Sequence, residues 1–318
     1  MEYLALIILI ITFPVLLVSY LCFCKAFRVS KKQKKIKEEY PLPPGSIYVP
    51  YRDTMITWMK EVRAMPYEEF CIRSFDGLRL YAKYYEREKG APMEIMFHGY
   101  RGNAERDLCG GVQRAFSLGR SVLIVDQRAA GKSDGNVITF GIKESRDCLS
   151  WVDFAIEHFG KDVKIILTGI SMGASTVMIA AGESLPKNVV GILADCGYSS
   201  PKEIIKKVIR DMKLPPNLSY PFVKLGALLF GRVDIEKYSC EQALKNCKLP
   251  IIFFHGDDDR YVPCEMSVQN HAACTSPKKL VLMKGAGHGM CYLMYPEQYL
   301  FEVSQFFTQN GVYTEIKK

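Results

Sequence analysis

The segment that decides the fold reads Ile165-Ile166-Leu167-Thr168-Gly169-Ile170-Ser171-Met172-Gly173, and the alanine-rich stretch 174–181 follows it. An aliphatic run that ends in Gly-x-Ser-x-Gly and continues as a helix-forming stretch predicts a sharp turn from a strand into a helix. Glycine on both sides of the serine gives this turn the steric room it needs. The turn lifts the serine hydroxyl to the positive end of a helix, which favours an oxyanion. We therefore take Ser171 as a candidate nucleophile.

Short apolar runs recur on both sides of this segment. A hairpin is predicted where residues 71–74 and 78–85 flank Phe75-Asp76-Gly77. Amphipathic stretches such as 143–159 separate the later runs, which is typical of parallel strands covered by helices on both faces. An α/β fold with a mostly parallel, doubly wound sheet of about eight strands is therefore expected. The later runs are 94–97, 122–125, 164–167, 189–194, 251–254 and 280–283.

A serine hydroxyl needs a base to act as a nucleophile at neutral pH, and the chain has five histidines. His288 follows the last predicted strand in a glycine-rich loop, Gly285-Ala286-Gly287-His288-Gly289, which can hold an imidazole over the serine turn. We therefore predict His288 as the base. The other four have simpler structural explanations at strand ends, a helix end or a polar helix: His98, His255, His158 and His271.

The base in turn needs a carboxylate that fixes its tautomer and stabilises the imidazolium. Three adjacent aspartates, residues 257–259, follow the predicted strand 251–254, and Asp195 follows the predicted strand 189–194. The chemistry of these residues alone leaves the choice among them open. An acid at 259 would give the chain order serine, aspartate, histidine, which this kind of fold imposes.

An oxyanion also needs backbone N–H donors aimed at the developing charge. We predict that one donor is the amide of Met172, directly after the candidate nucleophile. The second is the amide of Tyr100, in the loop His98-Gly99-Tyr100-Arg101-Gly102-Asn103 after strand 94–97. A plain turn at the end of the strand is the simpler alternative for His98-Gly99.

Together these motifs resemble the α/β-hydrolases, in particular the serine aminopeptidase-like and prolyl-oligopeptidase-like group and its bacterial members with an N-terminal membrane segment. The resemblance covers about residues 65–310. It implies an α/β-hydrolase fold and a Ser-His-Asp triad whose acid is Asp259, four residues after His255. Ala130 departs from the pattern, in which histidine is frequent, and this bears on pocket shape and not on the triad. The motifs are His98-Gly99…Asn103, Asp126-Gln127-Arg128…Gly131-Lys132-Ser133-Asp134-Gly135, Gly169–Gly173, Asp195-Cys196-Gly197-Tyr198 and His255-Gly256…Asp259…Val262-Pro263.

The N-terminus is strongly apolar. Tyr3 to Cys24 carries no charge and is long enough to cross a hydrocarbon core about 30 Å thick. A cleaved signal peptide would have basic residues before the run, but only Glu2 precedes it. We therefore expect residues 1–24 to be a single-pass transmembrane anchor, in the membrane through residues 3–24. The basic residues that follow predict a cytoplasmic catalytic domain: Lys25, Arg28, Lys31, Lys32, Lys34, Lys35 and Lys37.

Residues 25–64 are expected to be a basic and proline-rich linker, because 41–45 reads Pro-Leu-Pro-Pro-Gly. Residues 65–318 then form the hydrolase domain. More than fifty residues separate strands 189–194 and 251–254, and helices predicted at 204–212 and 222–230 suggest a small cap at about 199–248. The apolar residues of the cap fit an acyl pocket, and packing in the core explains them almost as well.

The composition of this 318-residue chain limits the classes of partner and cofactor that we expect it to bind. The net charge is +8, but the cluster after residue 24 supplies most of the excess, so no nucleic-acid partner is expected. Eleven cysteines without C-x-x-C or zinc-finger spacing indicate reduced thiols and neither a disulfide framework nor a metal site. No metal or organic cofactor is expected.

We expect a serine hydrolase that cleaves a small carboxylic ester, or a related acyl bond such as a thioester, through an acyl-enzyme. An aminopeptidase or other short-peptide hydrolase is the first alternative. A non-catalytic, membrane-tethered binding protein that keeps the fold is the second. The intact candidate triad argues against the second alternative.

Overall fold

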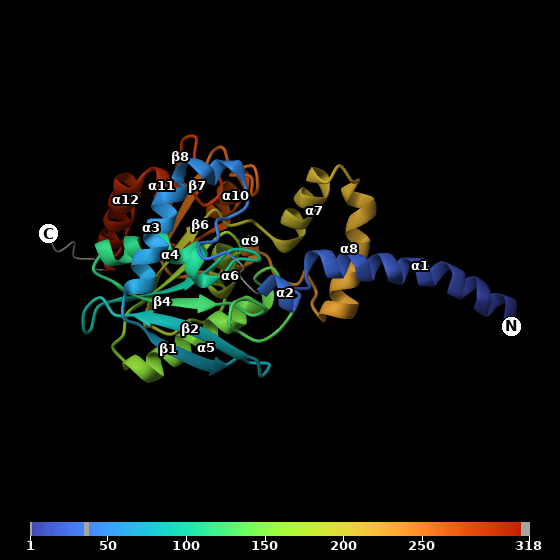
Figure 1. The fold of residues 1–318 in the computed structure, drawn as a ribbon, viewed down its shortest axis with the longest axis horizontal. Coiled ribbons are helices and arrows are strands. Elements are labelled where there is room, and N and C mark those ends of the chain that lie inside the picture. Colours follow the sequence, from blue (N-terminus) through green and yellow to red (C-terminus); the bar gives the residue numbers. More distant parts are fainter. Residues whose placement is uncertain (1, 35–37, 313–318) are drawn as a thin grey trace.

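An eight-stranded sheet runs through the computed structural model, which describes residues 2–34 and 38–312 (Figure 1). The strand order is β1-β2-β4-β3-β5-β6-β7-β8. β2 pairs antiparallel with β1 and with β4, and all other pairs are parallel. The predicted eight-stranded, mostly parallel sheet is thus confirmed. Its strands are β1 (Glu68–Arg73), β2 (Arg79–Tyr85), β3 (Met93–Phe97), β4 (Ser121–Asp126), β5 (Ile165–Ile170), β6 (Val189–Asp195), β7 (Ile251–Gly256) and β8 (Lys278–Met283).

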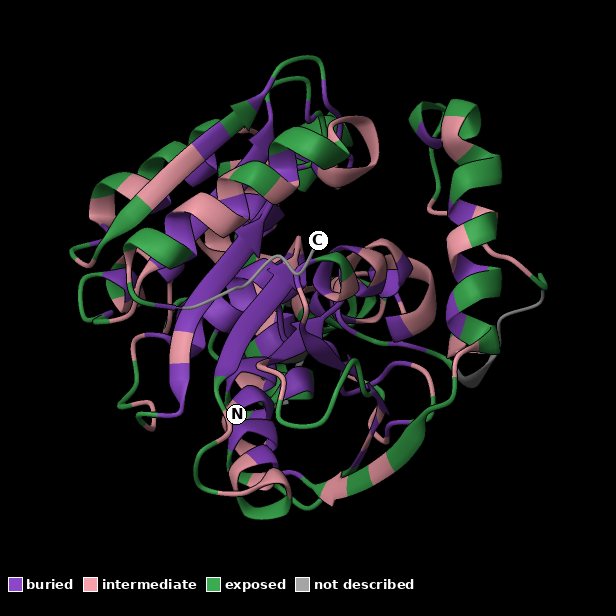
Figure 2. Cartoon of the chain, turned by 90° about the vertical axis from the view of Figure 1, so that its left-hand side faces the viewer, coloured by how far each residue is buried: buried purple, intermediate pink, exposed green. Residues whose placement is uncertain are grey.

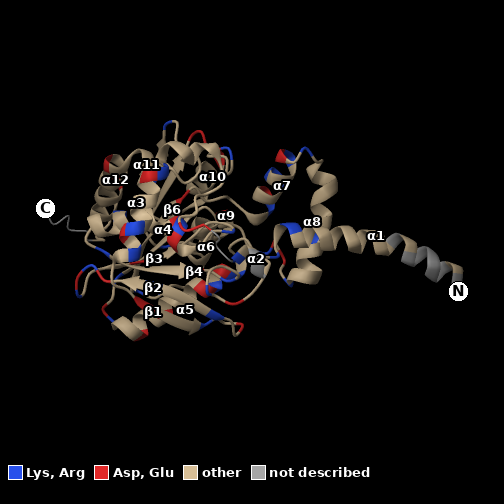
Figure 3. Ribbon diagram, in the orientation of Figure 1, with Lys and Arg blue, Asp and Glu red and all other residues tan. Residues whose placement is uncertain are grey.

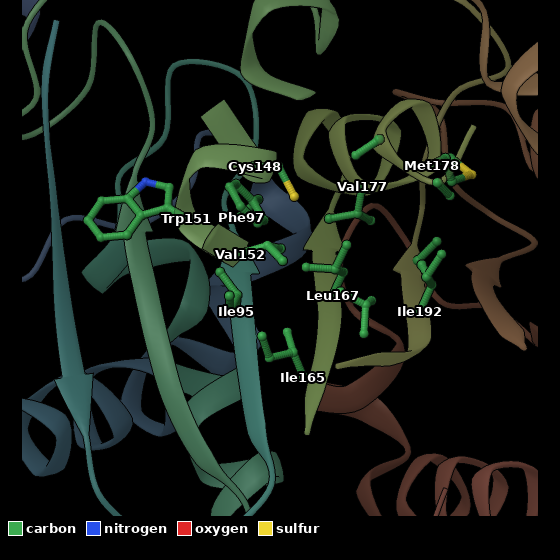
Figure 4. Packing of buried hydrophobic residues seen from close by; sticks show 14 of the residues in the cluster. Ile95, Phe97, Cys148, Trp151, Val152, Ile165, Leu167, Val177, Met178 and Ile192 are labelled. Carbon is green, nitrogen blue, oxygen red and sulfur yellow. The ribbon is translucent and has the colours of Figure 1, made fainter. Parts of the chain in front are cut away.

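Helices cover both faces of the sheet because its central strands are apolar on both sides. Alternate residues of a strand point to opposite faces, so Ile95 and Phe97 of β3 pack with α5 and α6 while Met96 packs with α3 and α4. Figure 4 shows the first of these layers, with Trp151 of α5 beside the strands. Figure 2 shows that the central strands are buried. The covering helices are α3 (Arg52–Ala64), α4 (Ala104–Ser117), α5 (Ile142–Phe159), α6 (Met172–Ala180), α9 (Cys240–Leu244), α10 (Glu265–Ala273), α11 (Cys291–Met294) and α12 (Pro296–Gln309).

Charged residues of both signs are spread over the loops and helices around the sheet (Figure 3), whereas a network around Glu94 of β3 lies inside. Glu94 is fully buried and forms ion pairs with the guanidinium groups of Arg114 in α4 and of Arg120. Arg120 Nη1 lies 2.6 Å from Glu94 Oε1. Thr168 of β5 donates a further hydrogen bond of 2.8 Å. Burial alone would raise the pKa of Glu94, but the two arginines hold it below its usual value. This network ties α4 to the middle of the sheet.

The segment 25–64, expected to be a linker, contains helices that pack on the domain. These are α2 (Lys31–Lys34), η1 (Ser46–Tyr51, a 3-10 helix) and α3. In α3, Met55, Met59 and Val62 are buried on one face, and the Trp58 ring lies 5.6 Å from the ring of Tyr292. The second half of this segment is therefore part of the packed structure. Lys35 and Lys37 of the basic cluster lie outside the described residues.

The apolar N-terminus forms helix α1 (Glu2–Ala26). Among residues 2–34 and 38–312, no helix combines the length and the apolar character that crossing a bilayer requires, so the structure does not support the predicted transmembrane anchor at 1–24. Near the end of α1, Phe23 and Phe27 are buried within the protein and their rings stack at 6.1 Å, whereas Phe13, Leu16 and Leu21 are exposed. The expected cytoplasmic location of the catalytic domain stays a prediction.

The predicted cap region holds α7 (Pro201–Asp211) and α8 (Pro216–Gly231). Figure 1 shows α1 crossing α8 and projecting away from the sheet. The two helices touch closely, since a Cβ on Gly226 would lie 2.2 Å from the carbonyl oxygen of Ser19. Buried residues of α1, α7 and α8 form one apolar cluster that extends to Met172, beside the candidate nucleophile.

Candidate active site

The turn between β5 and α6 holds Ser171 in a backbone conformation that L-residues rarely adopt, with φ 57° and ψ −118°. Both neighbouring glycines are required by space. A Cβ on Gly169 would lie 2.1 Å from the carbonyl oxygen of Gly173, and one on Gly173 would lie 1.9 Å from that of Phe97. The Ser171 amide donates to the carbonyl of Asp195 at 2.8 Å, which fixes the turn against β6.

The structure brings Ser171, His288 and Asp259 together from three different loops. His288 Nε2 lies 2.9 Å from Ser171 Oγ, and His288 Nδ1 lies 2.7 Å from Asp259 Oδ2. Because a carboxylate only accepts, Nδ1 carries the proton and Nε2 presents its lone pair to the hydroxyl. The loops follow β5, β7 and β8, so all three side chains stand at the carboxyl ends of strands in the parallel part of the sheet. This geometry allows a proton to pass from the hydroxyl to the imidazole.

Asp259 is held by four hydrogen-bond donors. Its Oδ1 accepts from the amides of Tyr261 and Val262 at 2.8 and 2.9 Å, and its Oδ2 also lies 3.2 Å from His255 Nε2. Burial alone would raise the pKa of Asp259, but hydrogen bonds from His255 and His288 hold it well below its usual value. Asp259 therefore stays ionised and faces His288 as a carboxylate.

The other candidate acids have different partners. Asp257 accepts from the Gly285 amide at 2.5 Å, and Asp258 pairs with Arg260 at the surface. Asp195 is buried, and its Oδ2 accepts from the Tyr299 hydroxyl at 2.9 Å. Burial raises the pKa of Asp195. Of these aspartates, Asp259 is the one that the described contacts join to His288.

The loop after β3 passes directly beside the serine. A Cβ on Gly99 would lie 3.5 Å from Ser171 Cβ, and the Gly99 amide is already used by Asp107 at 3.2 Å. Within the described part of the chain, neither the Tyr100 amide nor the Met172 amide has a hydrogen-bond acceptor. Met172 follows Ser171 directly and Tyr100 follows Gly99, so the two amides remain the predicted oxyanion donors.

His98 supports this loop and does not reach Ser171. Its Nε2 accepts a hydrogen bond of 3.1 Å from the backbone amide of Gln127. Its Nδ1 therefore carries the proton and donates to the Gly99 carbonyl at 2.8 Å. His158 lies among aromatic rings, 4.7 Å from that of Phe70. The reading of these histidines as structural agrees with their contacts.

Sequence reasoning missed Tyr48, which lies in the presumed linker. Its hydroxyl donates to the backbone carbonyl of His288 at 2.8 Å. An aromatic residue in a proline-rich stretch carries no signal for such a contact, because the two residues are 240 positions apart.

A metal ion fits the site poorly. Within the described residues, ligand atoms of Cys196, Asp259 and His288 lie within 4.8 Å of one another. However, Asp259 and His288 are already hydrogen-bonded to each other, and burial raises the pKa of the Cys196 thiol well above its usual value. A thiol that keeps its proton is a poor ligand. The cluster therefore fits proton transfer better than metal binding.

Comparisons with known proteins agree with this architecture. Residues 95–239 match the family described as alpha/beta hydrolase fold. The YqkD protein of Bacillus subtilis is 26% identical over 199 residues, which is 62% of this chain and 65% of that protein, so the chain spans just under two thirds of this relative's length. Protein bem46 of Schizosaccharomyces pombe is 26% identical over 222 residues, 68% of each chain.

Among solved structures, an esterase of Pyrococcus furiosus superposes with a TM-score of 0.63 at 23% identity, and the match covers 85% of this chain and 96% of that one. At this identity the likeness concerns the fold. The strand order, the strained serine turn and these matches lead to one conclusion: the chain has the α/β-hydrolase fold.

Proposed function

We propose that the protein is a serine hydrolase that cleaves a small carboxylic ester or a related acyl bond. The observation that carries this proposal is the continuous hydrogen-bonded chain from Ser171 through His288 to Asp259. The esterase named among the structural neighbours supports the ester as the first substrate class to test. The apolar cluster that joins the cap to Met172 supports an apolar acyl group.

In the proposed reaction, Ser171 Oγ attacks the substrate carbonyl while its proton passes to His288 Nε2. Asp259 stabilises the imidazolium that forms. The oxyanion of the tetrahedral intermediate accepts from the amides of Tyr100 and Met172, and one such donor is worth about 10²–10³ in rate. His288 then gives its proton to the leaving alcohol, and the acyl group stays on Ser171.

Water completes the cycle. His288 takes a proton from a water molecule, whose oxygen attacks the acyl carbonyl, and the second tetrahedral intermediate collapses to the free acid and Ser171. Every proton moves between substrate, water and this chain's own residues, so the reaction is balanced without a further reactant.

A fluorophosphonate probe tests the proposal, because it labels only an activated serine. We expect the unsubstituted chain to be labelled, Ser171→Ala to be unlabelled, and Ser117→Ala, at the end of α4, to be labelled normally. A panel of p-nitrophenyl esters and aminoacyl anilides then separates an esterase from a peptidase. Folded protein that takes up no probe would instead indicate a binding protein that keeps the fold, and preference for the anilides would indicate the peptidase.

A further inference from the structure

The loop that carries His288 depends on support from outside itself. It contains three glycines in five residues, and Gly285 and Gly289 have positive φ values of 68° and 67°. Such backbone has access to many conformations. The imidazole must nevertheless stay within hydrogen-bond range of both Ser171 and Asp259. Contacts that restrain this loop therefore bear directly on the geometry of the site.

The 3-10 helix η1 supplies such a contact. Tyr48 is 8% exposed and donates its hydroxyl proton to the His288 carbonyl at 2.8 Å. Burial raises the pKa of Tyr48, so the phenol remains a neutral donor. The next residue back, Ile47, lies against the loop as well, since a Cβ on Gly287 would come within 2.9 Å of Ile47 Cδ1. Two successive residues of η1 thus border His288.

The helix η1 is itself anchored. The Tyr48 ring packs with Met55 of α3 and with Met290, two residues after His288. The following helix α3 is pressed onto α4, where a Cβ on Gly110 would lie 2.8 Å from the ring of Trp58. The Tyr48 hydroxyl that bonds to His288 is therefore held by a ring that is itself packed against Met55 and Met290.

We infer that Tyr48 is a positioning residue for His288, and that it restrains the loop of His288 together with Ile47. The inference rests on the proposed function for its kinetic consequence, but the restraint on the imidazole is a property of the structure alone. Tyr48 acts through the backbone of His288 and touches no reacting atom. A misplacement of about 1 Å in a catalytic group costs on the order of 10²-fold in rate, so the loss of this restraint lowers turnover.

The test compares Tyr48→Phe with Tyr51→Phe in the full chain. Phenylalanine at 48 keeps the ring that packs with Met55 and Met290 and removes only the hydroxyl. Tyr51 belongs to the same 3-10 helix and the same apolar cluster, and its hydroxyl has no hydrogen-bond partner within the described residues. With p-nitrophenyl acetate we expect Tyr48→Phe to lower kcat about 10- to 100-fold with KM within about twofold, and Tyr51→Phe to change neither.

Proton NMR gives a readout that does not depend on activity. The Nδ1 proton of His288, bonded to Asp259, should resonate far downfield and is identified by its loss in His288→Ala. In Tyr48→Phe this signal should shift upfield or broaden, and in Tyr51→Phe it should be unchanged. If the unsubstituted chain hydrolyses no ester, the proposed function fails while this signal still tests the positioning. An unchanged signal and an unchanged kcat in folded Tyr48→Phe would overturn the inference.

Discussion

At the scale of single residues, the site depends on the hydrogen bonds that the Asp259 carboxylate accepts from two histidines. His288 Nδ1 and His255 Nε2 both point at Oδ2 of Asp259, while two backbone amides occupy Oδ1. One carboxylate thus orients two imidazoles and a turn of the chain. Asp195, one strand away, is buried against a tyrosine hydroxyl instead. We therefore expect different losses of activity when Asp259 and Asp195 are each replaced by asparagine.

We expect Asp259→Asn to lower kcat/KM for an ester by about 10⁴-fold, because an amide stabilises the wrong tautomer of the imidazole and cannot balance the imidazolium charge. Asp195→Asn should lower it by less than about tenfold. Steady-state kinetics of the two variants make the comparison. A larger loss in Asp195→Asn would assign the acid to that residue.

Asp259 also predicts how stability changes with pH. Its pKa in the folded chain lies below the value of about 4 expected for an unfolded aspartate. The unfolded state therefore binds its proton first, so this contribution to the free energy of unfolding is complete above about pH 4 and is lost as pH falls through the lower folded value. Urea titrations below pH 4 should show a weaker pH dependence in Asp259→Asn. Equal slopes for the two proteins would contradict the lowered pKa.

At the scale of elements, the turn from β5 into α6 is set by its glycines. A Cβ on Gly173 would lie 1.9 Å from the carbonyl oxygen of Phe97, and backbone cannot move away as a flexible side chain can. We expect Gly173→Ala to lower the free energy of unfolding by more than about 3 kcal/mol, measured by urea denaturation. The matched control is Gly90→Ala.

Gly90 has φ 77° and open space around its Cα, so Gly90→Ala isolates the cost of the backbone conformation, about 1–2 kcal/mol. If both alanine variants lose the same free energy, the turn can relax around a methyl group. The close approach between Gly173 and β3 would then not be what fixes Ser171.

The elements themselves were largely predictable, since β3 to β8 all coincide with aliphatic runs bounded by turn residues. Helix α3 was not predicted, although Met55, Met59 and Val62 follow helical spacing, because the proline-rich stretch before it suggested a linker. The apolar run at the N-terminus forms helix α1, and Phe23 near its end is buried in the cluster that also holds residues of α8. Apolar composition alone does not predict that contact.

The parts of the candidate site that follow directly after a strand were also predictable from local sequence patterns. Ser171, His288 and the loop of Tyr100 each stand next to a strand end, where the parallel sheet brings them to one edge. Their motifs are local, so they are visible in the sequence. The chemistry of the three adjacent aspartates left the acid open, and the resemblance alone selected Asp259. The contact of Tyr48 depends on how loops pack, and no local pattern carries that information.

At the scale of the whole molecule, the buried network of Glu94 joins three elements with charges that water cannot reach. Removal of one partner leaves the others unpaired, and breaking a buried ion pair in this way costs about 3–5 kcal/mol. We expect Glu94→Ala to lower the free energy of unfolding by that amount or to prevent folding, as measured by thermal denaturation and soluble yield. Glu69→Ala serves as the control.

Glu69 pairs with Lys132 at the surface, and exposed pairs contribute about 0–1 kcal/mol. A comparable loss in the two variants would show that the arginines find other partners. The sheet would then not rely on Glu94 for its connection to α4.

The long sequence separation between the parts of the site has a consequence for biosynthesis. Ser171 precedes His288 by 117 positions, and Tyr48 precedes it by 240. A ribosome therefore finishes the serine turn long before the imidazole and its loop leave the exit tunnel. A nascent chain, or one cut short by a premature stop before residue 288, carries the Ser171 hydroxyl without the imidazole that lies 2.9 Å from it in the folded chain.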